Sequence, residues 1–196
     1  MIVYGIDCGV TNLAVVKLRV EDEKRVVVEY AKTINLGSKG PLRFTVFNKF
    51  VSRHMLEEGY VRIEFQHRCG KSRDVSFYIN GYLSAMFDEK KIMQMQPRLK
   101  FKFAEDLKIM PDCGDLKIYK NRKDAAIKVL QIVRSKLEFE NAKEVDKMTK
   151  KDDVADALLY ALAAVRDMCP NALLDLSETA ATLQPIKRPH VQKIVL

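Results

Sequence analysis

Four acidic residues stand where an unpaired charge needs a physical explanation. Asp7 ends the apolar run MIVYGID, and burying a carboxylate there is costly unless a partner or a cation compensates its charge. Glu64 falls on the polar face of an alternating segment, VRIEFQ. Asp153 and Asp156 are three residues apart in a helical pattern, where their like charges repel. A divalent cation with oxygen ligands would remove these penalties.

Each of these acids also has an ordinary structural interpretation. Asp7 can cap a turn at the end of a strand, and Glu64 can face solvent on an exposed strand. The helical pair can form a solvated acidic face near a helix N-terminus, where the helix dipole tolerates acids. A metal site therefore requires that the fold bring all four together.

Asp152 competes with Asp153 for a place in such a site. Asp152 and Asp156 are also neighbours on a helix, because they are four residues apart. Thr149 followed by Asp152 resembles a capping box, which would give Asp152 a structural task. This pattern favours Asp153 as the ligand and leaves Asp152 as the alternative.

Basic residues surround the candidate site in the sequence. The chain has 34 Lys and Arg against 26 Asp and Glu, a net charge of +8, which favours polyanionic partners such as nucleic acid. Residues 117–151 hold eleven basic and five acidic side chains. A charge run can equally be a solvated face. The candidate DNA-binding residues are Arg68, Lys71, Arg73, Lys120, Arg122, Lys123, Lys150 and Lys151.

Periodicity predicts the elements that would position these side chains. Strands are expected over residues 1–8, 12–20, 25–34, 60–65 and 91–96, and helices over 42–58, 74–88, 121–137 and 149–166. Asp74 is a candidate N-cap, and Phe77, Tyr78 and Tyr82 are assigned to a helix core. Residues 98–117 are interpreted as a loop or lid-like insertion and 138–150 as a polar connection. The prediction is an α/β fold with a mixed five-stranded sheet, a three-strand antiparallel meander plus two parallel strands, covered by helices.

Length and composition bound the class of protein. The 196 residues fit one domain, expected over 1–166, with a C-terminal extension over 167–196 that is basic at its end. No apolar run is long enough for a membrane span, and no signal peptide is expected. The four cysteines form no C-x-x-C pair and there are only three histidines, so disulfides and zinc are poorly supported. We expect an intracellular protein in a reducing compartment.

Taken in order, the motifs resemble those of the RuvC-type Holliday junction resolvases of the RNase H-like superfamily. The resemblance is greatest to the poxvirus-like branch found in large DNA viruses. It extends over residues 1–166 and consists of GIDCGVTN at 5–12, IEFQ at 63–66, YKNRK at 119–123 and DVADA at 153–157.

The resemblance implies a specific activity. A homodimer would cut four-way DNA junctions by paired nicks, at the site of viral DNA replication in the host cell if the protein is viral. Two Mg²⁺ ions, which Mn²⁺ can replace, would be held by a catalytic quartet: Asp7, Glu64, Asp153 and Asp156. One ion would activate water and the other would stabilise the leaving 3′-oxygen.

Some features depart from the resemblance or allow other functions. Family members often carry an apolar or aromatic wedge shortly after the strand-four glutamate, whereas His67 and Arg68 stand here. RNase H-like nucleases acting on RNA–DNA hybrids, flaps or other branched DNA would share the metal site. An actin-like ATPase or sugar kinase would share the loop at residues 7–12 but needs a second domain. A non-catalytic DNA-binding module would explain the charge but not the acids on three separate elements.

Overall fold

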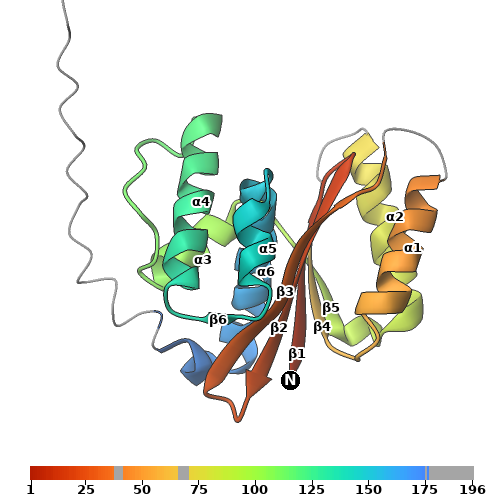
Figure 1. Ribbon diagram of the computed structural model, residues 1–196, viewed down its shortest axis with the longest axis horizontal. Helices are drawn as coiled ribbons and strands as arrows, with labels where there is room; N and C mark the ends of the chain where they lie inside the picture. Colours follow the sequence, from red (N-terminus) through yellow and green to blue (C-terminus); the bar gives the residue numbers. More distant parts are fainter. Residues whose placement is uncertain (38–41, 66–70, 175, 177–196) are drawn as a thin grey trace, which may run out of the picture.

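The computed structural model describes residues 1–37, 42–65, 71–174 and 176 (Figure 1). Its strands are β1 (Ile2–Cys8), β2 (Asn12–Glu21), β3 (Arg25–Asn35), β4 (Tyr60–Glu64), β5 (Ile92–Met95) and β6 (Glu138–Phe139). Its α-helices are α1 (Leu42–His54), α2 (Lys71–Met86), α3 (Leu99–Asp106), α4 (Tyr119–Arg134), α5 (Ala142–Lys147) and α6 (Lys151–Met168). Two 3₁₀ turns, η1 (Glu89–Lys91) and η2 (Pro170–Leu173), complete the described elements. The predicted α/β class is confirmed.

One mixed sheet with the strand order β5-β4-β1-β2-β3-β6 forms the centre of the molecule. Strands β1, β2 and β3 make the predicted antiparallel meander, and β4 and β5 add in parallel beside β1. The sheet has six strands rather than the predicted five, because β6 pairs in parallel with β3 through Val27–Glu138 and Val28–Phe139. A two-residue strand is too short to show a periodicity of its own.

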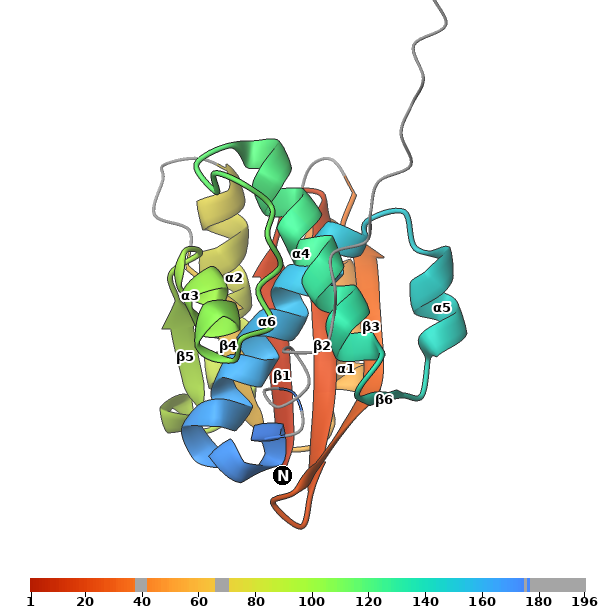
Figure 2. The same ribbon diagram turned by 90° about the vertical axis from the view of Figure 1, so that its left-hand side faces the viewer.

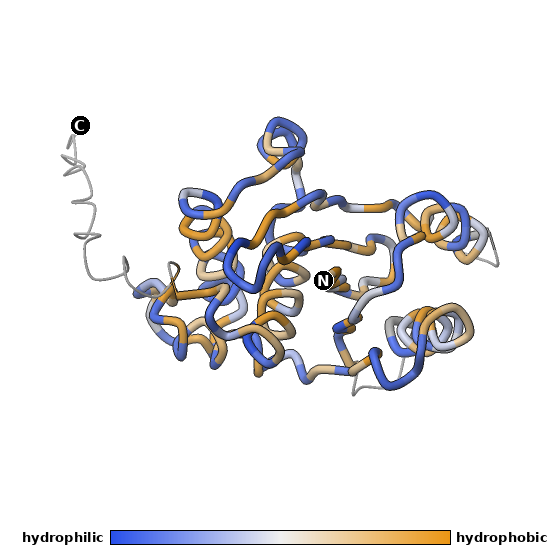
Figure 3. Tube along the Cα trace, turned by 90° about the horizontal axis from the view of Figure 1, so that it is seen from below, coloured by the Kyte–Doolittle hydropathy of each residue, from blue (hydrophilic) through white to orange (hydrophobic). Residues whose placement is uncertain are grey.

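Helices cover both faces of the sheet. Figure 1 shows α1 and α2 on one face and α3, α4, α5 and α6 on the other, and Figure 2 looks onto this second layer. Alternation along β1 supplies both cores, since Val3 packs toward α6 while Tyr4 and Ile6 pack toward α1 and α2. The strands and α6 are mainly apolar and the polar segments lie toward the periphery (Figure 3).

Helix α6 is more deeply buried than its amphipathic pattern suggested. Every residue from Val154 to Val165 except Asp156 is buried, because α6 lies between the sheet and the helices α3 and α4. Gly5 allows this close approach. A Cβ atom at position 5 would lie 2.0 Å from the Ala157 carbonyl oxygen and 2.7 Å from the Ala161 nitrogen.

Other predictions require correction. Residues 98–117 are not wholly a loop, because they contain α3, which is too short to show a clear helical period. Helix α5 lies within the predicted polar connection, and α1 ends at His54, four residues before the predicted end. Helix α2 starts at Lys71, so Asp74 lies in its first turn rather than at its N-cap. Phe77 does not belong to the helix core, since it is 53% exposed.

The part of the predicted C-terminal extension that the structure describes packs on the domain. Ala172, Leu173 and Leu176 are buried in the core on the α6 side, and Lys136 Nζ donates a hydrogen bond of 2.6 Å to the Leu176 carbonyl. Residues 177–196 lie outside the described residues. A search of the described helices finds none with the length and apolarity needed to cross a membrane.

Gly5→Ala should destabilise the fold through the contact of β1 with α6. We expect a loss of about 3 kcal/mol or more in the free energy of unfolding, because overpacking against backbone atoms forces strand and helix apart. Gly81→Ala is the matched control, since a Cβ atom at this position in α2 meets nothing within 4 Å. That change should stabilise the protein by roughly 0.5–1 kcal/mol. Denaturant unfolding measures both, and a fully stable Gly5→Ala protein would contradict the packing argument.

Candidate active site

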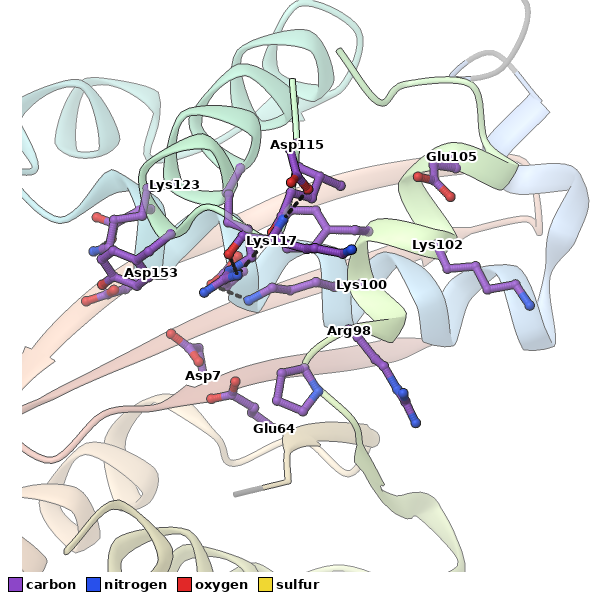
Figure 4. Close-up of a pocket in the computed structure, with 18 of the residues that line it drawn as sticks. Asp7, Glu64, Arg98, Lys100, Lys102, Glu105, Asp115, Lys117, Lys123 and Asp153 are labelled. Atoms are coloured by element: carbon purple, nitrogen blue, oxygen red, sulfur yellow. Dashed lines mark hydrogen bonds and ion pairs between the residues drawn. The ribbon is translucent and has the colours of Figure 1, made fainter. Parts of the chain in front are cut away.

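The first two carboxylates stand at the ends of neighbouring strands. Strands β1 and β4 run parallel with Ile6 beside Ile63, so Asp7 and Glu64 follow at the same end of the sheet. Ile63 packs toward α1 and α2, and the predicted alternation along this strand therefore turns Glu64 toward α6. Glu64 is only 8% exposed. Figure 4 shows Asp7 and Glu64 pointing into one shared space.

The other two carboxylates come from the first turns of α6. Asp153 and Asp156 line the same cavity of about 1090 Å³ as Asp7 and Glu64. The structure thus places the four members of the predicted quartet, from β1, β4 and α6, in the lining of one cavity. The opposite wall is formed by α3, the connection that follows it and the start of α4.

A lysine that the sequence analysis missed lies among these acids. Lys100 of α3 is 7% exposed, and its ammonium forms an ion pair with Asp156. It also lies 5.6 Å from the centre of the Tyr160 ring. Burial would lower the pKa of Lys100, but the charges of Asp156, Asp7 and Glu64 outweigh burial and raise it. Lys100 is therefore a buried counter-charge to the quartet.

Burial and like charge act together on the carboxylates. Burial first, and then the charge of Glu64, raise the pKa of Asp7 well above its ordinary value. Burial raises the pKa of Asp156 to about 7, with Lys100 opposing the rise and Asp7 adding to it. Burial and the neighbouring Asp152 also raise the pKa of Asp153. Negative charge is thus held in this cavity at an energetic cost.

The oxygen donors of the cavity are of the type that a hard divalent cation prefers, although among the residues that the structure describes they do not converge on one ion. All four acids offer oxygen ligands, and Asp156 Oδ1 is buried without a hydrogen-bond partner in the described part of the chain. Within the described residues, no three acidic, histidine or cysteine side chains lie close enough together to chelate one ion. The Lys100 ammonium supplies the positive charge at Asp156 instead.

Asp152 has a different partner. Its carboxylate forms an ion pair with Lys123 of α4, and this pair, against the effect of burial, lowers the pKa of Asp152. The predicted capping box is wrong, because the N-cap of α6 is Lys150 and no side chain caps it by a hydrogen bond. Asp152 thus has a structural role, as expected, but its role is to link α6 to α4 through this ion pair. This arrangement favours Asp153 as the member of the quartet.

The predicted basic residues occupy several positions around the site. Arg122 and Lys123 line the cavity, whereas Lys120, Lys150 and Lys151 lie at the starts of α4 and α6 outside its lining. Arg73 is in the first turn of α2, the side chain of Lys71 is not described, and Arg68 lies outside the described residues. Three further cations line the cavity and were missed because residues 98–117 showed no clear pattern: Arg98, Lys102 and Lys117.

Lys100→Met should destabilise the protein in the absence of divalent cations. Removing one partner of a buried ion pair leaves the other charge uncompensated, so we expect a loss of about 3 kcal/mol in the free energy of unfolding. Mg²⁺ should then raise the melting temperature of this variant more than that of the wild type. Lys102→Met, an exposed change on the same helix, should alter neither quantity appreciably. Equal stability of Lys100→Met and wild type in EDTA would contradict the role of Lys100.

Comparisons with known proteins agree with the fold. Residues 1–168 match the family of the poxvirus A22 protein. No curated protein matches the chain by sequence. The fowlpox virus resolvase, solved with substrate Holliday junction DNA, is similar in structure with a TM-score of 0.62 and 16% identity, over 86% of this chain and 99% of that chain.

Two further solved structures share the fold. The yeast mitochondrial Holliday junction resolvase Ydc2 has a TM-score of 0.56 and 16% identity, over 91% of this chain and 83% of its own. RuvC of T. thermophilus, in complex with a Holliday junction substrate, has a TM-score of 0.55 and 18% identity, over 87% of this chain and 98% of its own. The predicted resemblance is confirmed, and with its match over residues 1–168 the chain belongs to the poxvirus A22 protein family.

Proposed function

We propose that this protein is a structure-selective endodeoxyribonuclease that resolves four-way DNA junctions by paired nicks. The observation that carries the proposal is the convergence of four carboxylates from β1, β4 and α6 in one cavity bordered by cations. Membership of the poxvirus A22 family supports it, as does the fold shared with proteins whose structures are named for Holliday junction resolution.

In the proposed reaction Asp7, Glu64, Asp153 and Asp156 hold divalent cations, with two Mg²⁺ ions as the preferred assignment. When bound, such ions supply Lewis-acid activation of water and stabilise the leaving oxygen. The chain's own contribution is to gather the acids at an energetic cost, which Lys100 relieves in part and which a bound divalent cation would relieve further. Lys100 holds the charge balance at Asp156 and competes with a cation for that carboxylate.

The cations that border the quartet would position the DNA backbone. Arg98, Lys102 and Lys117 line the cavity on one side, and Arg122 and Lys123 line it at the start of α4. Cations beside a carboxylate site can hold the phosphates that flank the scissile bond. Paired nicks on opposite strands need two such sites, and we therefore propose a homodimer. We place its action where viral DNA is replicated, in a reducing compartment of the host cell.

Asp7→Asn should abolish cutting of a synthetic four-way junction in Mg²⁺ while leaving binding intact. The expected fall in rate is about a thousandfold or more, since metal stabilisation of the transition state is worth several kcal/mol. Denaturing gels that resolve both nicked strands measure the rate.

Junction, linear duplex, RNA–DNA hybrid and flap should be compared in parallel. Equal cutting of duplex or hybrid would remove the resolvase assignment, and full activity of Asp7→Asn would remove the metal site.

Asp152 and Asp153 can be separated by the same substitution. Asp153→Asn should lose cutting as Asp7→Asn does, because it removes a charged oxygen ligand. Asp152→Asn should cost less than about tenfold in rate, because it weakens the ion pair with Lys123 and removes no metal ligand. Isothermal titration with Mg²⁺ provides a readout independent of cutting. The opposite ranking of the two variants would make Asp152 the ligand.

A further inference from the structure

Two exposed apolar residues stand at the start of α4, and one of them, Tyr119, lines the carboxylate cavity. Ile118 and Tyr119, at the junction of the connection with α4, are 54% and 64% exposed. Tyr119 is the most exposed aromatic residue in the described part of the chain, and it lines the same cavity as the quartet. Packing of the domain does not require a side chain in this position. The Tyr119 hydroxyl contacts Lys123, and the exposed ring beside the acids is available to a partner outside the chain.

Two cations lie beside the Tyr119 ring and restrict its motion. The Arg122 guanidinium lies 5.6 Å and Lys123 Nζ 5.1 Å from the ring centre. Both cations are themselves held, since Arg122 donates hydrogen bonds of 3.0 Å to the carbonyls of Leu116 and Lys117. Lys123 is anchored by its ion pair with Asp152 at the start of α6. The ring is thus held in the lining of the same cavity as the quartet.

We propose that Tyr119 is a stacking platform for one unpaired base of branched DNA, a role that rests on the proposed function. Bases stack on aromatic rings with little dependence on sequence, and neighbouring cations can hold the adjoining phosphates. A continuous duplex keeps its bases stacked on each other and offers none to the ring. A junction can release a base where its strands exchange. Tyr119 therefore contributes selectivity for branched DNA, while the quartet cuts.

The chain offers matched variants for a binding test. In the Asp7→Asn background, which keeps the DNA intact, Tyr119→Leu should weaken binding of a four-way junction about tenfold, the size expected for one lost stacking contact. Binding of linear duplex should not change. Tyr119→Phe retains the ring and should bind like the parent. Phe77→Leu removes a similarly exposed ring on α2, outside the cavity lining, and should also bind like the parent.

An abasic scan of the junction identifies the base. At one nucleotide near the exchange point, removal of the base should lower the affinity of the parent protein for the junction. The same DNA should bind Tyr119→Leu no more weakly than the intact junction does, so the losses of affinity from the protein change and the DNA change are not additive. Equal weakening of junction and duplex, additive losses at every nucleotide, or no effect of Tyr119→Leu would each overturn the stacking role. If the wild type prefers a flap or hybrid, the proposed function fails, and the same scan on that substrate decides the role of Tyr119. A protein that binds none of these nucleic acids overturns both.

Discussion

Helix α6 lies so close to β1 that its Ala157 carbonyl would be 2.0 Å from a Cβ atom at position 5. This approach is possible because residue 5 is glycine and the facing residues of α6 are alanines. It sets the height of α6 above the sheet, and hence the position of Asp156 relative to Asp7. A bulkier residue at the crossing would separate acids that the site must hold together. The geometry of the quartet thus depends on a contact between small residues that carry no chemistry.

The close approach creates an electrostatic problem that the fold solves only in part. Burial and mutual repulsion raise the pKa values of Asp7, Asp153 and Asp156. Lys100 offsets some of this repulsion, and Asp156 Oδ1 remains buried without a partner in the described residues. An interior with stability alone as its purpose would hold apolar residues here. Unfavourable energy retained in a cavity of this kind is characteristic of functional sites, where activity and stability compete.

The sequence predicts those parts of the site that depend on regular periodicity. Asp7 and Glu64 could be placed because each interrupts a strand pattern, and Asp156 because it follows a helical one. Lys100 could not be predicted, since a lysine in the short helix α3 shows nothing of its burial until the sheet and α6 enclose it. The same holds for the Lys123–Asp152 pair, which joins residues 29 positions apart. Local pattern suggested a cap for Asp152, and tertiary contact provided a different partner.

Phe77 and Tyr119 show that the exposure of a side chain, unlike the periodicity of a helix, cannot be predicted from the local sequence. The helical spacing of Phe77 predicted a core position, yet half of its side chain is exposed. Tyr119 stands in the basic segment YKNRK, whose charge predicts contacts with DNA but not the exposure of the ring. A carboxylate quartet alone would not separate a junction resolvase from a nuclease acting on hybrids, because both need the same metal chemistry. Selectivity must therefore come from what surrounds the quartet, and in this chain the cations and the exposed ring at its rim are the groups placed to provide it.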